Sequence, residues 1–301
     1  MMSLQDHPLE HYSDAQLLRL IRESPSLEHH AGIVLLSESY LAKRYYPDRV
    51  EDTIETVELA CKLRVRAPVI RRTVEDDVLT WCIMDRIEGD TLEEVWGEIS
   101  WLKSITLALQ LRGFIRILRS VQSSTAGSLV TGTCRSFWLE DLYRLPARAT
   151  IYAVNAFINF WMEFISIGKE IRKSASQHRV QPKQHLSPTN AFVFTHHDLA
   201  PRNIILHPSG HLWLLDWDYA GWYPKCFEYA AMHNFHIPGN WNRWTRLRWK
   251  LFCWIAAGFY DQDARVLRTV QSKFRRFRAA RRFNIKANGY ASIAGRNSDS
   301  S

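Results

Sequence analysis

The chain has 301 residues, of which 46% are hydrophobic and 23% charged, so it can bury a sizeable core and is not globally disordered. Its longest apolar run, Leu251–Tyr260, falls short of the ~18–20 residues that a membrane-spanning helix needs, so we expect no membrane span. The first residues have neither the basic start nor the apolar core of a signal peptide, and the five cysteines form no CxxC pair. These features favour a cytoplasmic protein with reduced thiols.

The net charge of +8 is concentrated at the C-terminal end. Residues 264–301 contain ten Lys or Arg and one Asp, so the other 263 residues sum to −1. Apolar residues recur here at helical spacing, which predicts an amphipathic helix docked on the rest of the protein: Val266, Leu267, Val270, Phe274 and Phe277. Residues 288–301 are predicted to be disordered. We do not expect a nucleic-acid partner, although a basic segment interleaved with Phe leaves that alternative open.

The first third of the chain combines short extended segments with one helix. Strands are predicted at 32–36, 39–43 and 78–84, the first two joined by a tight polar turn. A helix over 51–63 is stopped by Pro68. After the third strand, Asp90 or Thr91 can cap the start of the next helix.

The rest of the chain is predicted to be mainly helical. Long helices at 101–121 and 151–171 are separated by a Ser-, Thr- and Gly-rich loop, and a second polar loop follows at 181–189. Short strands come next, and an aromatic-rich helix ends this region: 192–194, 204–206, 212–215 and 240–260. The sequence therefore predicts an α+β protein with a small mixed lobe followed by a larger helical lobe.

Polar residues gather at the ends of the predicted strands in the second half of the chain. Asp198 and Asn203 share a loop that contains Pro201, and Asp216 ends the returning strand of a hairpin. Two carboxylates and an amide oxygen brought to one point are hard oxygen ligands, which suit Mg²⁺ carrying phosphate.

Three segments around these residues resemble the aminoglycoside phosphotransferase family, which is related to choline kinases, and especially its fungal members. His196–Asn203 (HHDLAPRN) matches the catalytic loop HGDLxxxN, with His197 in place of Gly. Leu215–Pro224 (LDWDYAGWYP) resembles the metal-binding segment IDWExAGxxP. Ile83–Leu92 (IMDRIEGDTL) is similar to the lobe-connecting strand and turn MExxxGxxL. With a lysine of the first lobe, the resemblance covers roughly residues 30–260.

The resemblance implies a two-lobed fold of the protein-kinase type. It also implies ATP- and Mg²⁺-dependent transfer of the γ-phosphoryl group to a hydroxyl of a small molecule. Residues 1–87 would form the nucleotide-binding lobe and residues 88–263 the helical lobe with the catalytic and metal loops. Residues 264–301 would add the basic helix and its disordered end.

The same resemblance assigns roles to matching residues in the second lobe. Asp198 would orient, and could deprotonate, the acceptor hydroxyl, while His196 would brace the catalytic loop. Asn203 and Asp216 would hold Mg²⁺ on the phosphates of ATP. Acidic residues for the metal and one lysine for phosphate are enough, because phosphoryl transfer relies on positioning and charge neutralisation.

In the first lobe, Lys43 would contact the α- and β-phosphates. The helix after it would supply a carboxylate partner for this lysine, with Glu55 preferred over Glu58. The adenine pocket would be lined by three residues of the link between the lobes: Met84, Asp85 and Ile87.

Several alternatives stay open at this point. Only Gly32 stands near the family's glycine-rich phosphate loop, and together with His197 this leaves a catalytically inactive, kinase-like binding protein as the second hypothesis. Asp218 is interpreted as a structural partner of an Arg or a backbone amide rather than a second metal ligand, and Glu228 as structural. The histidines match no zinc-site spacing. Trp222 and Tyr223 are candidates for substrate contact. The loops expected to bind the acceptor are residues 123–137 and the region near Trp222, and neither concentrates the acidic residues that a polycationic aminoglycoside would favour.

Overall fold

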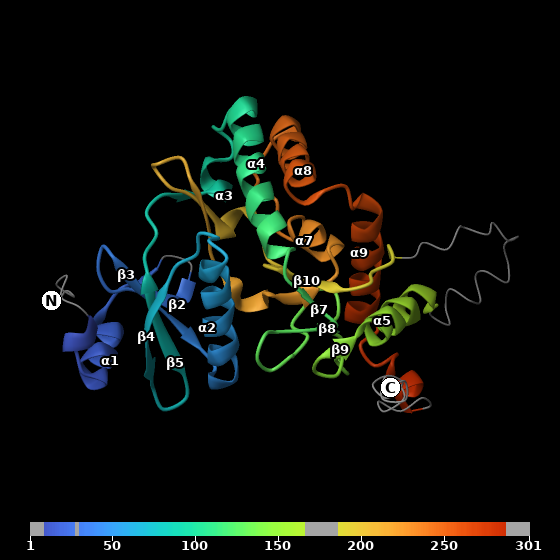
Figure 1. Ribbon diagram of the computed structural model, residues 1–301, viewed down its shortest axis with the longest axis horizontal. Helices are drawn as coiled ribbons and strands as arrows, with labels where there is room; N and C mark the ends of the chain where they lie inside the picture. Colours follow the sequence, from blue (N-terminus) through green and yellow to red (C-terminus); the bar gives the residue numbers. More distant parts are fainter. Residues whose placement is uncertain (1–8, 28–29, 166–185, 287–301) are drawn as a thin grey trace, which may run out of the picture.

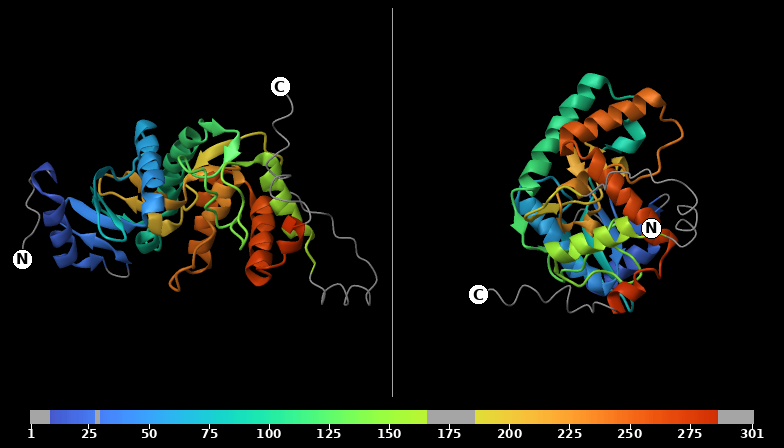
Figure 2. Two further views of the ribbon diagram at one scale, coloured as in Figure 1. Left: turned by 90° about the horizontal axis from the view of Figure 1, so that it is seen from below. Right: turned by 90° about the vertical axis from the view of Figure 1, so that its right-hand side faces the viewer.

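The computed structural model describes residues 9–27, 30–165 and 186–286, and places them in two lobes along the long axis of the molecule (Figures 1 and 2). A small lobe built on a sheet holds the N-terminal part of the chain, and a mainly helical lobe holds the rest. The predicted α+β fold class with two unequal lobes is confirmed. Predictions for 288–301 and for parts of 151–171 and 181–189 lie outside the described residues.

The small lobe is built on an antiparallel five-stranded sheet with the order β1-β2-β3-β5-β4. Helix α1 (Asp14–Glu23) and helix α2 (Pro47–Lys62) lie on opposite sides of it (Figure 1). The strand bounds are β1 Ser26–Leu27, β2 His30–Leu35, β3 Tyr40–Tyr45, β4 Ile70–Glu75 and β5 Thr80–Asp85. Three of these strands and α2 were predicted; α1, β1 and β4 were not.

Alternation of side chains along β3 and β5 places the first site residue. Ala42 and Ile83 pack with α1 on one face, whereas Tyr45 and Met84 pack on the other face, toward α2. Because successive side chains of a strand point to opposite faces, Lys43 shares the α2 face with Tyr45. The predicted strand lysine is thus turned away from α1.

The link between the lobes requires a glycine. Gly89 has φ 121°, and a Cβ there would lie 2.4 Å from the carbonyl oxygen of Leu206. The chain then forms β6 (Asp90–Thr91) and α3 (Leu92–Val95). Of the two predicted caps, Asp90 and Thr91, it is Thr91 that caps the helix, and Glu94 completes a capping box. We keep 87/88 as the proposed boundary between the lobes.

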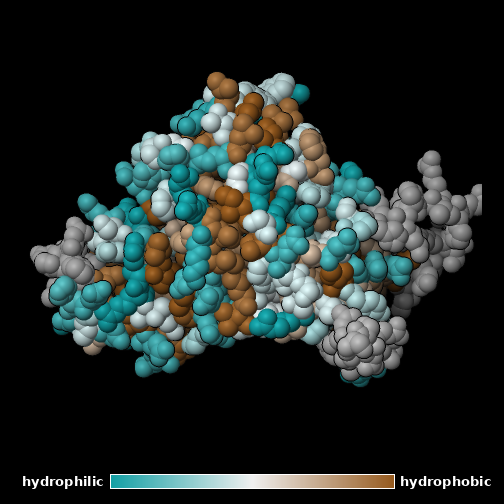
Figure 3. Space-filling model, viewed as in Figure 1, coloured by the Kyte–Doolittle hydropathy of each residue, from teal (hydrophilic) through white to brown (hydrophobic). Residues whose placement is uncertain are grey.

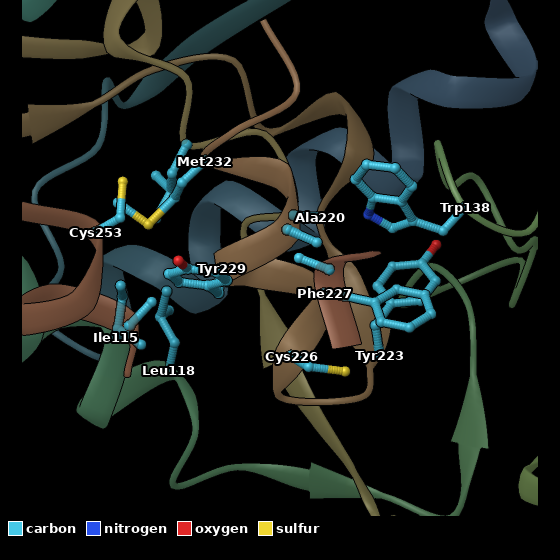
Figure 4. Close-up of a cluster of buried hydrophobic side chains, with 14 of the residues drawn as sticks. Ile115, Leu118, Trp138, Ala220, Tyr223, Cys226, Phe227, Tyr229, Met232 and Cys253 are labelled. Carbon is cyan, nitrogen blue, oxygen red and sulfur yellow. The ribbon is translucent and has the colours of Figure 1, made fainter. Parts of the chain in front are cut away.

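Within the described part of the large lobe, α3 and the longer helices pack around one core, part of which is drawn in Figure 4. The core brings together Ile115 and Leu118 of α4, Tyr229 of α7 and Cys253 of α8. The helix bounds are α4 Trp101–Leu118, α5 Ile151–Glu163, α7 Cys226–Ala231, α8 Arg243–Ala257 and α9 Asp261–Arg276.

Helix α9 carries much of the basic C-terminal segment. Its apolar face, which includes Val266, Val270 and Phe274, is buried, and α9 packs against α5 and α7. Because α9 begins before residue 264, the residues from 264 to 276 continue the large lobe.

Short antiparallel strands carry the two loops that were singled out in the sequence. The catalytic loop, residues 196–203, joins β10 to β11, and the metal segment, residues 215–220, joins β12 to β13. Strand β10 pairs with β7 and β13, and β11 pairs with β6 and β12. The strand bounds are β7 Gln122–Ser123, β8 Thr125–Ala126, β9 Ala149–Thr150, β10 Phe192–Thr195, β11 Ile204–Leu206, β12 Leu212–Leu214 and β13 Gly221–Tyr223.

Apolar side chains also reach the surface, notably along α4 (Figure 3). Leu102 and Leu109 are exposed, although the opposite side of α4 is buried through Leu107 and Leu111. Among the described residues, no helix combines the length and the apolar character that crossing a membrane requires.

Candidate functional site

Lys43 joins the small lobe to the metal segment of the large lobe. Its Nζ donates hydrogen bonds to Oδ1 of Asp216 at 2.8 Å and to Oδ2 of Asp218 at 2.9 Å. Burial alone would lower the pKa of Lys43, but the attraction by Asp216, Tyr45 and Asp218 together outweighs it, so the pKa lies well above its usual value. The lysine is therefore charged at neutral pH.

The two aspartates differ in their own ionisation. Burial disfavours the charged form of both, but Lys43 overrides this effect at Asp216 and lowers its pKa. At Asp218 burial and repulsion by Asp216 prevail, and the pKa is raised. Asp218 thus has Lys43 as its partner, instead of the Arg or backbone amide expected from the sequence.

The predicted pairing of Lys43 with Glu55 is wrong for this structure. Glu55 is exposed and makes no hydrogen bond or ion pair with any residue of the described ranges, and the alternative, Glu58, pairs with Lys62 at 3.1 Å. The reason lies in the rotation of α2. Its buried face carries Asp52, whose carboxylate is held by a loop of the large lobe, so the glutamates point outward.

His196 ties the catalytic loop to the metal segment. Its Nε2 donates to the carbonyl oxygen of Leu215 at 2.9 Å, and its Nδ1 accepts from the backbone N–H of Asp198 at 3.3 Å. Burial lowers the pKa of His196 to about 4, so the ring is neutral at pH 7. This arrangement fits a bracing role.

Asp198 is almost fully buried and is surrounded by donors. Its carboxylate accepts from Nη2 of Arg202 at 3.0 and 3.1 Å and from Nδ2 of Asn203 at 2.9 Å. Burial raises the pKa of Asp198 to about 6, although Arg202 opposes the shift. The carboxylate is mainly ionised at pH 7 and can still accept a proton, as a general base requires.

Asn203 and Asp216 present free oxygen atoms. The Nδ2 of Asn203 is used by the side chain and carbonyl of Asp198, whereas its Oδ1 accepts no hydrogen bond within the part of the chain that the structure describes. Asp216 adopts a left-handed conformation, with φ 62°, and its side chain is 38% exposed. An amide oxygen and a carboxylate therefore remain for a divalent cation.

Glu228 holds the backbone of the catalytic loop. Its Oε2 accepts from the N–H of His196 at 2.7 Å, and its Oε1 accepts from the N–H of His197 at 3.0 Å. Burial raises the pKa of this carboxyl to about 7. Glu228 thus has the structural role expected from the sequence, because it holds the two residues that precede Asp198.

His197, which stands in place of the glycine of the family motif, is fully buried with φ 66°. Its Nε2 lies 2.8 Å from Oγ of Ser136, and its ring stacks on Tyr223 with centroids 4.5 Å apart. Burial lowers the pKa of His197 to about 3, so the ring is neutral. Tyr223 is buried as well and belongs to the core rather than to a substrate surface (Figure 4).

The residues expected around adenine lie at the end of β5 and in the link. Met84 is buried, Ile87 is half-buried, and the carboxylate of Asp85 accepts from Arg71 at 2.7 and 2.9 Å. Gly32 lies inside β2, where a Cβ would come within 3.4 Å of Arg44, so it is a strand residue. The connection from β1 to β2 includes residues outside the described ranges.

Sequence reasoning did not identify the roles of Arg202, Ser136 and Asp52. Arg202 could have been found, because its position within the catalytic loop places it near Asp198. Ser136 and Asp52 act through contacts between segments far apart in the chain, for which the sequence carries no local signal.

A two-lobed fold in which a strand lysine of the small lobe contacts an acidic loop of the large lobe defines a kinase-like class of protein. Consistent with this, the model of the phosphotransferase enzyme family (APH) matches residues 34–258. The chain belongs to this family. No curated protein sequence matches it.

Solved structures of aminoglycoside phosphotransferases share the fold, among them the following two. The aminoglycoside phosphotransferase APH(3'')-Id from Streptomyces rimosus, solved with ADP and streptomycin, is 14% identical with a TM-score of 0.51, covering 86% of this chain and 97% of its own. Aminoglycoside phosphotransferase APH(4)-Ia is 12% identical with a TM-score of 0.51, covering 93% of this chain and 96% of its own.

Proposed function

We propose that the protein transfers the γ-phosphoryl group of ATP, with Mg²⁺, to a hydroxyl group of a small molecule. The observation that carries the proposal is the contact of Lys43 with Asp216. It places a strand lysine of the small lobe, the type of cation that binds phosphate in kinases, against the acidic metal segment. Membership of the phosphotransferase family and the ADP in a related structure support it.

Asn203 and Asp216 are the residues that would hold Mg²⁺. The amide Oδ1 of Asn203 is free of hydrogen bonds to the described residues, and Asp216 is ionised and partly exposed, so both suit a hard cation. The cation would supply charge neutralisation on the phosphates. Lys43 would add a second positive charge on the same groups.

Asp198 would accept the proton of the acceptor hydroxyl. Its carboxylate is oriented by Asn203 and Arg202, and its backbone N–H donates to His196. Glu228 holds the backbone of the two preceding residues. The guanidinium of Arg202, whose side chain is 40% exposed, would also lie near the charge that develops during transfer. Met84, Asp85 and Ile87 are retained as the proposed adenine-binding residues.

The acceptor is proposed as a hydroxylated small molecule and not specifically an aminoglycoside. The residues of the loop at 123–137 and of the segment near Trp222 include no concentrated acidic run of the kind that a polycation favours, and Arg135 of this loop adds a positive charge. Streptomycin in one related structure is a property of that protein.

The test is a screen of hydroxylated compounds with labelled ATP and Mg²⁺. With an acceptor found, Asp198→Asn should reduce kcat by about 100-fold or more, since general-base catalysis contributes roughly 10²–10⁴. Asp77→Asn, in the exposed β4–β5 turn, is the matched control and should retain full activity. Unchanged turnover in Asp198→Asn would show that the catalytic assignment is wrong.

A second candidate is a catalytically inactive nucleotide-binding protein. It is favoured by one observation: Glu55, the partner expected for Lys43, is exposed. This candidate predicts weak or metal-independent nucleotide binding and no phosphorylated product from any acceptor.

A further inference from the structure

One segment of the large lobe touches three parts of the candidate site. We call residues Ser128–Phe137, which lie in the predicted Ser-, Thr- and Gly-rich loop, the bridging segment. It contacts α2 of the small lobe through Asp52, the catalytic loop through His197, and the metal segment through Tyr219. The contact to the metal segment is a stack of Phe137 on Tyr219, with ring centroids 4.3 Å apart.

The contact to the small lobe is a buried carboxylate surrounded by donors. Asp52 is 4% exposed and accepts bonds from side-chain hydroxyls and backbone amides of the bridging segment: Ser128 Oγ at 2.9 Å, Val130 N at 2.8 Å, Thr131 N at 3.1 Å and Thr131 Oγ1 at 2.6 Å. Arg135 lies 3.4 Å from the same carboxylate. Burial raises the pKa of Asp52, but the hydrogen bonds from Thr131 and its neighbours outweigh it, and the net pKa is lowered. Helix α2 is thus bound to the bridging segment by an ionised group.

The contact to the catalytic loop runs through two adjacent residues. Ser136 is fully buried, and its Oγ lies 2.8 Å from Nε2 of His197. Tyr223, on which the ring of His197 stacks, donates its hydroxyl to the carbonyl oxygen of Arg135 at 2.6 Å. Position 197 is therefore tied to the bridging segment both by its own side chain and by its stacking partner.

The backbone conformation of His197 indicates that its contact with the bridging segment costs conformational free energy. A φ of 66° is readily adopted by glycine but is uncommon for other residues. A bulky side chain persists in such a conformation only when surrounding contacts fix it. Here the contacts are with Ser136 and Tyr223, and His197 directly precedes Asp198.

We propose that His197 is a positioning residue that, through Ser136, makes the placement of Asp198 depend on the anchoring of α2 by Asp52. The proposal rests on the proposed function for the role of Asp198. A glycine at position 197 would form the same turn, but the loop would have no side-chain link to the bridging segment. The anchoring of α2 would then have less effect on the conformation of the catalytic loop.

The first test compares Ser136→Ala, His197→Gly and the double variant. ATP hydrolysis in the presence of Mg²⁺ reports turnover without an identified acceptor, and ADP titration reports binding. Each single variant should lower kcat by about tenfold, with the Kd for ADP changed less than twofold, since small misplacements of a reacting group carry large rate penalties. The double variant should be no slower than the slower single variant, because both remove the same bond.

Ser104→Ala is the matched control. It removes the hydroxyl of another buried serine, which donates to the carbonyl oxygen of Ser100 in α4, away from the site. Its kcat should equal that of the parent. If Ser136→Ala behaves like Ser104→Ala, or if the effects of the two site substitutions multiply, the proposal is overturned.

The second test does not require activity. Amide hydrogen exchange of residues 195–203 should accelerate about tenfold or more in Asp52→Asn and in Ser136→Ala, while exchange in α9 stays unchanged. Unchanged exchange in the catalytic loop would refute the coupling whatever the turnover. A parent protein that neither binds nor hydrolyses ATP, yet shows this coupling, would instead refute the proposed function.

Discussion

At the scale of single residues, the site is defined by carboxyl groups that share one region but differ in ionisation. Asp216 is held in its charged form by Lys43, whereas burial raises the pKa of Asp198 to about 6. Such divergence between neighbouring groups is typical of sites that divide metal binding and proton transfer among carboxylates.

The raised pKa predicts an acid limb in the pH profile. Asp198 must be ionised to accept a proton, so kcat/KM should fall as the pH drops through about 6. Arg202 lowers this pKa, so Arg202→Gln should move the limb to higher pH, while Arg202→Lys should move it less. Initial rates between pH 5 and 8 would measure both shifts.

An acid limb that stays in place in Arg202→Gln would contradict this reading of the Arg202–Asp198 contact. Arg49→Gln offers a comparison, since Arg49 also lies near the metal segment but does not contact Asp198. It should leave the limb where it is in the parent.

The sequence located the site loops but not the partners of each side chain. The candidates Asp198, Asn203 and Asp216 could be named because phosphate and metal chemistry restrict both residue type and spacing. Glu55 was chosen by position along a helix alone. Which face of α2 points inward is decided by Asp52 and the backbone amides of residues 130–131, which lie far away in the sequence.

At the scale of elements, the basic C-terminal segment is anchored by a buried ion pair. Nη2 of Arg281 donates to Oδ1 of Asp141 at 2.8 Å and to the carbonyl oxygen of Arg144 at 2.6 Å. The side chains of Arg281 and Asp141 are 5% and 0% exposed. Arg281, which follows α9, is therefore part of the packed body of the large lobe.

Breaking this pair should be strongly destabilising. Asp141→Asn leaves the Arg281 charge buried without its carboxylate, and we expect a loss of about 3–5 kcal/mol in the free energy of unfolding. Glu140→Gln, which affects the more exposed pair with Arg144, should change it by less than about 1 kcal/mol. Urea unfolding followed by tryptophan fluorescence measures both. Equal losses in the two variants would contradict the anchoring role.

Long, regular elements were predicted more accurately than short ones. Long amphipathic segments such as α4 and α8 were predicted at nearly their observed bounds, whereas α7 and β4 were missed. Helix α7 has only six residues, all buried, so it shows no alternation of polar and apolar faces. Helix α2 starts four residues before its predicted start because Pro47 is well suited to a first helical position.

At the scale of the whole molecule, buried histidines couple folding to pH. Burial lowers the pKa of His196 and His233 to about 4 and that of His197 to about 3, so all three are neutral in the folded state. Their stabilising contribution is complete above the ordinary histidine value near 6.5 and is lost as the pH falls toward about 4. Asp198 and Glu228, with pKa values raised to about 6 and 7, act oppositely: their contribution is complete at low pH and is lost as the pH rises through these values.

Between pH 5 and 6.5 the three histidines contribute a rise in Tm, which the carboxyls with raised pKa values oppose: Asp198, Glu228, Asp218 and Asp141. His233→Phe should make the rise shallower, because it removes one of the three groups at a position packed on Tyr229. Differential scanning calorimetry across this range would detect the trend. The same dependence of Tm on pH in His233→Phe as in the parent would contradict the assignment of a neutral, buried ring.

The central claim, a site for ATP and Mg²⁺ between the two lobes, is tested most directly by thermal shift. The parent protein and Asp216→Ala would be melted with ATP, with and without Mg²⁺. A ligand at a hundredfold excess over Kd stabilises the fold by about 2.7 kcal/mol, enough for a clear rise in Tm. We predict a Mg²⁺-dependent rise in the parent that is lost in Asp216→Ala; no rise at millimolar ATP, or an equal rise in both proteins, would contradict the account.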